Sequence, residues 1–366
     1  MTDSAAVRAP REAVPLRVAV VVGSGAVGSF LGGTLAAAGW DVTLLGRRGG
    51  PVADVVAAPL VIAGPRRRRR VAPVRRAADP NAASESPDLV ILAVKMYDLQ
   101  GALGAAARWP ETPLMTIQNG IGAEALAADA RRSPLIAGSL TTAVEPTADG
   151  VARRRTGGLG IAPVRGDTTG LRHELADAFA DGGLPTVACP DAASMKWSKL
   201  LANLVGNATS ALLDMDPGAI WADAAGFDLE RRQLREALAV MREQRLEVVS
   251  LPGGQVRALL LGLGLPAAIA RPMLATAIGR ARGGKDPSLR IRLRGGGTGP
   301  TENRWLNGAV ADAGARLGIA TPVNAALAEL VDEAAQDAGA GERWRGRPDA
   351  LRAMCDGWDR DESRGA

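Results

Sequence analysis

A lysine and two asparagines are regularly spaced in the otherwise apolar stretch SMKWSKLLANLVGNATS, residues 194–210. Lys199, Asn203 and Asn207 are four residues apart, so in a continuous helix their side chains share one face. A buried amide without a partner is costly, and a buried ammonium group costs more. This face therefore needs polar partners, which are either neighbouring groups of the protein itself or a polar ligand.

A second candidate site follows the first apolar run. Residues 18–22 are apolar and mostly β-branched, so the stretch 16–22 predicts a strand buried on both faces, and residues 26–38 predict a helix. The turn between them fits the dinucleotide-binding pattern G-x-G-x-x-G inside a βαβ unit that is completed by a strand at 41–45. The helix N-terminus offers N–H groups to a pyrophosphate. The expected contacts are Gly23, Ser24, Gly25, Ala26, Val27 and Gly28.

The residues after the second strand indicate which dinucleotide binds. NAD-binding proteins usually have an acidic residue there for the ribose diol, whereas this chain has Gly46, Arg47 and Arg48. Arg47 can pair with a 2′-phosphate, which predicts NADP(H). The alternative is that these arginines only face solvent. Lys95 and Asn119 follow two further predicted strands, at the edge of the sheet where ligands of doubly wound folds bind.

The pattern of elements divides the chain into two domains and two tails. Strands and helices alternate up to about residue 190, and almost only helical patterns follow. We therefore expect an α/β fold class, with a disordered tail (1–15), a Rossmann-type NADP-binding domain (16–190), an all-helical substrate domain (191–337) and a C-terminal extension (338–366). The helical domain could pair two chains as a homodimer.

Composition excludes several other classes of protein. Two distant cysteines and a single histidine, His173, give no disulfide framework and no metal-ligand spacing, which favours a reducing cytoplasm and no metal. Neither a signal peptide nor a membrane span is expected. The net charge is +5, and the most basic stretch is PRRRRRVAPVRR at 65–76. No aromatic residues stand nearby to stack on bases, so this stretch predicts a solvated loop or a charge-protected edge strand rather than a nucleic-acid site.

Five segments together resemble the ketopantoate reductase (2-dehydropantoate 2-reductase) family. They are the glycine-loop unit, AVK at 93–95, QNGIG at 118–122, the 197–212 helix, and PSLRIRLRGGGTGPTENRWLNG through TPVN at 287–324. The resemblance spans residues 17–335. It implies a Rossmann domain followed by a helical domain, with the active site in the cleft between them, and NADPH-dependent reduction of a 2-keto acid.

The resemblance also implies a role for individual residues. Lys199 falls on the catalytic lysine, which would give a proton to the ketone oxygen, and Glu302 falls on an acidic residue that positions Lys199 or the nicotinamide ribose. Substrate-binding positions correspond to Asn203, Asn207 and Ser288, with Asn119 beside them. Nucleotide-contacting positions correspond to Arg47, Lys95, Asn119, Ala143 and Glu302.

Two alternatives to a ketopantoate reductase remain at the level of sequence. Residues 288–303 depart from the family pattern and carry Arg290, Arg292 and Arg294, which would suit a paralogue that reduces another keto acid or an imine. The second alternative is a non-catalytic protein that binds NADPH as a sensor. Both Lys199 and Glu302 are present, which favours the enzyme.

Overall fold

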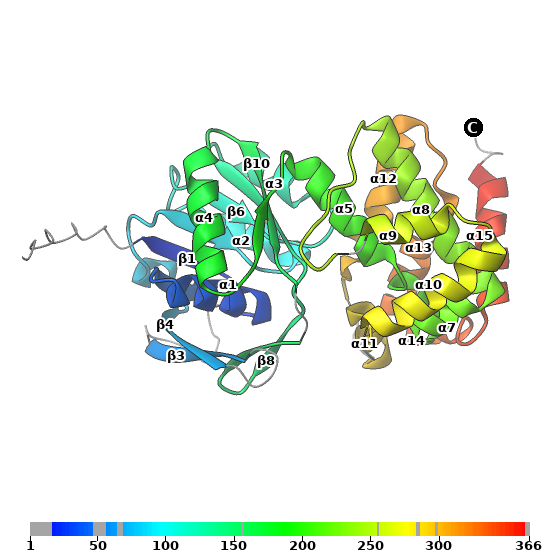
Figure 1. The fold of residues 1–366 in the computed structure, drawn as a ribbon, viewed down its shortest axis with the longest axis horizontal. Coiled ribbons are helices and arrows are strands. Elements are labelled where there is room, and N and C mark those ends of the chain that lie inside the picture. The colour runs from blue at the N-terminus through cyan, green and yellow to red at the C-terminus, as the bar shows by residue number, and fades with distance from the viewer. Residues whose placement is uncertain are drawn as a thin grey trace, which may run out of the picture.

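The computed structural model describes residues 17–46, 56–63, 69–154, 157–254, 256–282, 286–296 and 299–362. The predicted tail at 1–15 and Arg47 lie outside the described residues. One end of the molecule holds the strands together with the helices that flank them, and the other end is entirely helical (Figure 1). The helix α5 (Ala192–Leu204) lies at the junction between the two halves.

The strands form one sheet in the order β11-β10-β7-β6-β5-β1-β2-β4-β3-β9-β8. The strands are β1 (Val18–Val22), β2 (Asp41–Leu45), β3 (Val56–Ala63), β4 (Arg69–Ala77), β5 (Leu89–Leu92), β6 (Leu114–Thr116), β7 (Leu135–Leu140), β8 (Val144–Thr147), β9 (Gly150–Arg153), β10 (Leu159–Arg165) and β11 (Thr186–Ala188).

Six of these strands make the parallel core of a dinucleotide-binding fold. The neighbours in the series β4-β2-β1-β5-β6-β7 all pair in parallel. This is the Rossmann strand order. The chain adds β2 and β4 on one side of β1, and it then returns to add β5, β6 and β7 on the other side. The predicted fold class is therefore confirmed for this half.

Helices cover both faces of the sheet, as the apolar run of β1 predicts. Ala19 and Val21 face a core made with α1 (Ala26–Ala37) and α4 (Thr169–Asp181). Val20 and Val22 face a second core made with α2 (Leu99–Ala106) and α3 (Ala123–Ala130). Because successive residues of a strand point to opposite faces, every position of β1 needs an apolar side chain.

The arginine-rich stretch corrects an expectation. Residues 65–68 of this stretch lie outside the described residues, and residues 69–76 are neither a loop nor an edge strand, because β4 lies between β2 and β3 in the sheet. Ala72 and Val74 point into the core, so Arg75 next to Val74 points to the opposite face. Arg75 pairs with Asp41 at 2.6 Å, and Arg70 donates to the carbonyl of Asp181 at 2.9 Å. These arginines hold the sheet and α4 together.

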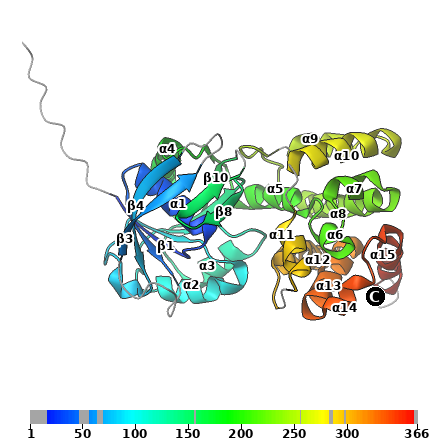
Figure 2. The same cartoon turned by 90° about the horizontal axis from the view of Figure 1, so that it is seen from below.

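The second half is helical and comprises, after α5, the helices α6 (Ala208–Leu213), α7 (Pro217–Ala222), α8 (Ala224–Glu243), α9 (Val256–Leu263), α10 (Ala267–Arg282), α11 (Ser288–Arg294), α12 (Asn307–Leu317), α13 (Pro322–Gln336), α14 (Ala338–Glu342) and α15 (Pro348–Glu362). In Figure 2, α9 and α10 form one side of this half and α12 to α14 the opposite side, with α5 and α8 between them. Three short 3₁₀ helices, η2 (Pro80–Ala82), η3 (Met96–Asp98) and η4 (Glu302–Trp305), complete the described elements.

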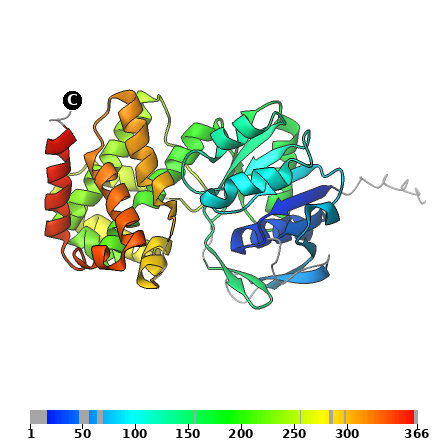
Figure 3. The same cartoon turned by 180° about the vertical axis from the view of Figure 1, so that it is seen from behind.

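The described residues of the C-terminal extension, up to Glu362, are a packed part of the helical half. Trp344, Leu351 and Cys355 are buried in a core shared with α13, and α15 runs along the outer edge of the helices (Figure 3). Burial raises the pKa of Cys355 to about 12. The extension therefore covers apolar surface of α8 and α13 that would otherwise face water.

A buried polar network joins α8, α12 and α13. Asn307 donates to Gln233 at 3.0 Å and to Asn324 at 2.9 Å, and Asn324 donates to Glu236 at 2.7 Å. Burial raises the pKa of Glu236, while hydrogen bonds from Asn324 and Val323 oppose that shift. The asparagines of the LNG and TPVN segments thus fix the packing of three helices. Within the described ranges, no helix is long and apolar enough to cross a membrane.

Candidate active site

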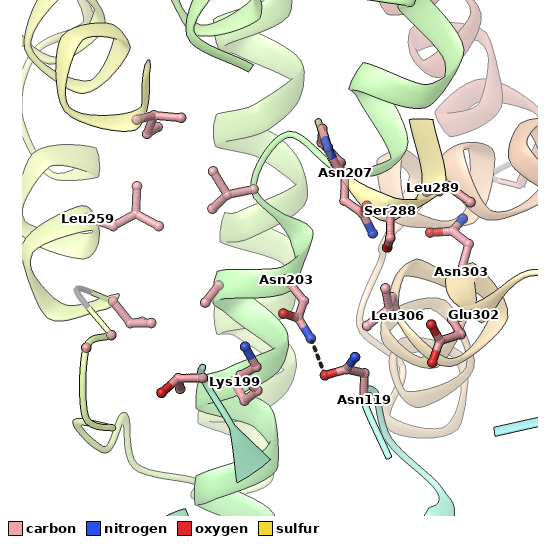
Figure 4. A pocket seen from close by; sticks show the side chains of 18 of the residues that line it. Asn119, Lys199, Asn203, Asn207, Leu259, Ser288, Leu289, Glu302, Asn303 and Leu306 are labelled. Carbon is pink, nitrogen blue, oxygen red and sulfur yellow. Dashed lines mark hydrogen bonds between the residues drawn. The ribbon is translucent and has the colours of Figure 1, made fainter. Parts of the chain in front are cut away.

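A cavity of about 780 Å³ lies between the two halves and is lined from both sides (Figure 4). The sheet contributes the residues just after β5, β6 and β7, which are Lys95, Asn119 and Thr141. Parallel strands present their carboxyl ends at one edge, so residues far apart in sequence meet there. The helical half contributes Lys199 and the side chains of α9 to α11.

The polar stretch 194–210 is not one continuous helix, which corrects the expectation from its spacing. α5 ends at Leu204, Gly206 has φ +55°, and α6 starts at Ala208. Lys199, Asn203 and Asn207 nevertheless all line the cavity. The three side chains therefore border the same cavity, but Asn207 reaches it through a turn of the chain rather than along the helical face that the spacing predicts.

The two lysines of α5 have different surroundings. Lys199 is half-buried and lines the cavity. Lys196 is 4% exposed, and its ammonium group pairs with Glu124 at 3.0 Å and donates to the carbonyl of Gln118 at 2.6 Å. The spacing of Lys199 to the asparagines predicts that it is the lysine at the site, and the cavity lining agrees. Lys196 ties α5 to the β6–α3 loop.

Asn119 stands on that same loop and faces α5. Its Oδ1 accepts a hydrogen bond from Nδ2 of Asn203 at 3.4 Å, as the dashed line in Figure 4 shows. The loop is fixed from the helical half as well, because the N–H of Ile121 donates to the carbonyl of Trp305 at 3.0 Å. A side chain at Gly120 would strike this carbonyl. The contacts hold Asn119 and Asn203 together across the junction.

Glu302 and Lys95 join the two walls of the cavity. The ammonium group of Lys95, beyond β5, forms an ion pair with the carboxylate of Glu302 at the start of η4. Glu302 is mostly buried, with 17% of its side chain exposed, whereas Lys95 is half exposed. The sequence predicts that both are site residues, and the structure brings them into contact with each other.

Two of the three arginines in the segment 288–303 form ion pairs with aspartates of the protein and do not line the cavity. Arg290 pairs with Asp214 at 3.1 Å and with Asp286 at 2.6 Å, and Arg294 pairs with the same two carboxylates. Burial opposes ionisation of Asp214, but hydrogen bonds from Arg294 and Arg290 outweigh it and lower the pKa of Asp214. Of the three arginines of α11, it is Arg292 that lines the cavity, together with Ser288 at the first position of the helix.

One wall of the cavity was not predicted from the sequence. Figure 4 shows Leu259 on the other side of α5 from Asn119 and Glu302. Its apolar neighbours come from α9 and α10 and are Val256, Ala258, Met273, Leu274, Ala277 and Ile278. In the sequence, the apolar stretch 256–278 indicates at most a candidate membrane segment. Its pattern of apolar residues does not distinguish a helix that lines a ligand cavity from one that packs in a core.

The glycine turn fits a dinucleotide. Gly23 has φ +110°, and a Cβ there would lie 2.8 Å from the backbone of Ala93. A Cβ at Gly28 would lie 1.8 Å from the carbonyl oxygen of Gly23, so the turn and α1 meet without side chains between them. Above Gly25 there is open space, and no side chain caps α1. The N–H groups at this helix end are thus available to an anion such as a pyrophosphate.

The cradle continues into the cavity, because Ala93 touches Gly23 and Lys95 lies two residues further on. Ala143 is not among the residues that line the cavity, and its carbonyl accepts a backbone hydrogen bond from Arg154 at 2.9 Å. Arg47 is outside the described residues, so the preference for NADP(H) rests on the sequence. Among the described residues, no group of His, Cys, Asp and Glu could hold a metal ion.

Comparison with known proteins gives the family. The model described as "Ketopantoate reductase PanE/ApbA" matches residues 19–162, and the model of the C-terminal part of the same family matches residues 191–335. A 2-dehydropantoate 2-reductase of Halobacterium salinarum is 30% identical over 321 residues, which cover 87% of this chain and 99% of the relative. The chain belongs to the ketopantoate reductase family.

Solved structures share the fold of this family member. A PanE/ApbA family ketopantoate reductase from Ralstonia eutropha JMP134 has a TM-score of 0.68 at 25% identity, covering 87% of this chain and 98% of the other. A D-mandelate dehydrogenase, solved with NADH and anilino(oxo)acetate, has a TM-score of 0.68 at 18% identity, covering 91% and 99% of the two chains. One family model matches the chain before residue 190 and the other matches it after residue 190, where strands give way to helices.

Proposed function

We propose that this chain is an NADPH-dependent reductase that converts a 2-keto acid to the 2-hydroxy acid, and that its substrate is 2-dehydropantoate (ketopantoate), reduced to pantoate in pantothenate and coenzyme A biosynthesis. The observation that carries the proposal is the cavity in which Lys199, Asn203 and Asn119 converge, at the edge of a dinucleotide-binding sheet. Membership of the ketopantoate reductase family supports the choice of substrate.

The residues that line the cavity have different roles in this reaction. NADPH, when bound, supplies the hydride for the carbonyl carbon. Lys199 donates a hydrogen bond and then a proton to the ketone oxygen, where negative charge develops. Asn203, Asn207 and Ser288 hold the carboxylate and hydroxyl groups of the substrate. Glu302 orients the side chain of Lys95 through their ion pair, where the two halves of the protein meet.

The binding of NADPH is assigned to the glycine turn and to the strand ends beside it. Residues 23–28 would hold the pyrophosphate, and Lys95 and Asn119 would face the nicotinamide ribose. Arg47 would pair with the 2′-phosphate, since an acidic residue there would repel it. The open space above Gly25 supports this assignment.

The decisive experiment follows NADPH oxidation by the purified protein with ketopantoate, with Lys199→Ala as the control. Turnover that falls by a factor of about 10² to 10⁴ in Lys199→Ala is the expected result, because general acid catalysis contributes about that much. If the wild type binds NADPH but does not oxidise it with any 2-keto acid, the proposal is wrong. Oxidation with an imine would then indicate the imine-reducing paralogue, and no oxidation with either class would indicate an NADPH-binding sensor.

A second substrate class is favoured by one specific observation. The wall of α9 and α10 presents Leu259, Met273 and Ile278 to the cavity, which suits a 2-keto acid with a large apolar side chain. A solved structure with the same fold is that of a D-mandelate dehydrogenase. Phenylglyoxylate and 4-methyl-2-oxopentanoate, measured beside ketopantoate, separate the classes: a higher kcat/KM for either one assigns the site to the apolar substrates.

We further propose that the protein works in the cytoplasm and forms a homodimer through its helical half. Both cysteines are free and buried, which suits a reducing compartment. Leu261 and Ile269 on α9 and α10 are 77% and 56% exposed, so a second copy could cover them. Size-exclusion chromatography with light scattering tests the dimer, and a monomeric mass at micromolar concentration would exclude it.

A further inference from the structure

We propose that Glu230 on α8 is a positioning residue that turns the chain between α5 and α6 and so directs the side chain of Asn207 into the cavity. The inference rests on the proposed function, because it gives Asn207 a role in holding the substrate. Glu230 does not line the cavity and would act only through Asn207.

At the break between α5 and α6, buried backbone groups need hydrogen-bond partners. Helix ends leave N–H and C=O groups without partners inside the helix. Gly206 is buried, and its N–H donates to Oε2 of Glu230 at 2.9 Å. The carbonyl of Leu204, at the end of α5, accepts a hydrogen bond from Gln233 at 3.4 Å. Both partners come from one face of α8, which thereby holds the two sides of the break.

Asn207 occupies the position at which an asparagine usually caps a helix. It is the residue before α6, yet its side chain makes no capping hydrogen bond to that helix. The buried carboxylate of Glu230 serves the start of α6 instead, since it also accepts from the hydroxyl of Thr209 at 2.5 Å. The amide of Asn207 is therefore left to line the cavity.

The carboxylate is held on its other side too, which fixes its place. Nε1 of Trp221 donates to Oε2 of Glu230 at 3.1 Å, and Glu230 is 0% exposed. A carboxylate out of water is tolerated only where several donors surround it. Because the turn at Gly206, α6 and α7 each supply a donor, the Glu230 carboxylate has little freedom and holds the turn at Gly206 in place. A Cβ at Gly206 would lie 2.7 Å from the side chain of Pro217, so the turn is closely packed on that side as well.

The test compares variants of Glu230 that differ in reach. Glu230→Asp keeps the charge but withdraws the carboxylate by one methylene, out of reach of Gly206. We expect the KM for the 2-keto acid to rise by roughly 10- to 100-fold, the range of one hydrogen bond to a charged group, while the Kd of NADPH stays within about twofold. Glu230→Gln should stay close to wild type, because its amide oxygen can accept from Gly206 and Trp221 while its NH2 group donates to the hydroxyl of Thr209.

Two controls separate positioning from loss of stability. Thr209→Val removes another hydrogen bond of the same carboxylate but leaves the Gly206 contact, so it should lower the melting temperature without raising KM. In an Asn207→Ala background, Glu230→Asp should add little to KM, because two residues that act through one contact are not additive. Equal KM values for Glu230→Asp and wild type, or fully additive effects with Asn207→Ala, overturn the proposal.

Hydrogen exchange at the amides of residues 205–209 gives a readout that needs no turnover. Glu230→Asp should speed exchange at Gly206, and Thr209→Val should leave it slow. Unchanged exchange at Gly206 in Glu230→Asp overturns the proposed anchor, even if the wild type reduces no 2-keto acid and the proposed function itself fails.

Discussion

Exchanging Lys196 and Lys199 for alanine, one at a time, separates the lysine of the fold from the lysine of the chemistry. Lys196 is 4% exposed and its partner Glu124 has 14% of its side chain exposed. Removing one partner of a buried ion pair costs about 3–5 kcal/mol, because the other charge is left unpaired. Glu124 keeps a hydrogen bond from Thr116 at 2.8 Å, so we expect a value near the lower end, about 3 kcal/mol. This is a large share of a typical folding stability of about 5–15 kcal/mol.

Lys199→Ala should change stability little, by less than about 1 kcal/mol, because the side chain is half-buried at the edge of a cavity. Its turnover should be lost instead. The free energy of unfolding is measured by urea denaturation followed by circular dichroism, and turnover by NADPH oxidation. A Lys196→Ala protein as stable as wild type refutes the assignment of a buried structural pair. An active Lys199→Ala beside an inactive but stable Lys196→Ala reverses the roles of the two lysines.

Three further predictions address the cofactor cradle, the arginine cluster and the C-terminal helices. Gly25→Ala should fold like wild type but bind NADPH more weakly in a fluorescence titration, whereas Gly28→Ala should lower the melting temperature as well, because its Cβ would lie 1.8 Å from a carbonyl oxygen. Asp214 has a lowered pKa in the folded protein, so the native state binds fewer protons there than the unfolded chain. Its stabilising effect is therefore present above the ordinary aspartate pKa and lost as the pH falls below about 4. In an acid titration, Asp214→Asn should therefore lose less stability than wild type between about pH 5 and about pH 3, the range that brackets the ordinary aspartate pKa. Burial raises the pKa of Cys355 to about 12, so its thiol should resist Ellman's reagent in the native protein and react once urea opens α15; fast labelling in native buffer would contradict the packing of that helix.

The dinucleotide half could be predicted closely because its signals are local. Strand β2 matches the predicted range 41–45, β1 ends at the predicted residue 22, and α1 begins at the predicted residue 26 and ends one residue before the predicted 38. Buried strands need continuous apolar runs, and a glycine turn between strand and helix has a distinct pattern. The position of Lys95 and Asn119 on adjacent strand ends followed from the same order of elements.

The sequence by itself determined the alternation of strands and helices in the first half, the glycine turn, and a set of candidate site residues of which Lys95, Asn119 and Lys199 line the cavity, because these signals depend on neighbours along the chain. The tertiary structure decided how those residues are used. In the folded protein the helix is interrupted at Gly206, and Lys196 rather than Lys199 is buried. Arg290 and Arg294 pair with Asp214, and α9 and α10 form the apolar wall of the cavity. A charge or an apolar side chain looks the same in a sequence wherever it points. Its partner is chosen by contacts between segments that are distant along the chain, and only the folded structure brings those segments together.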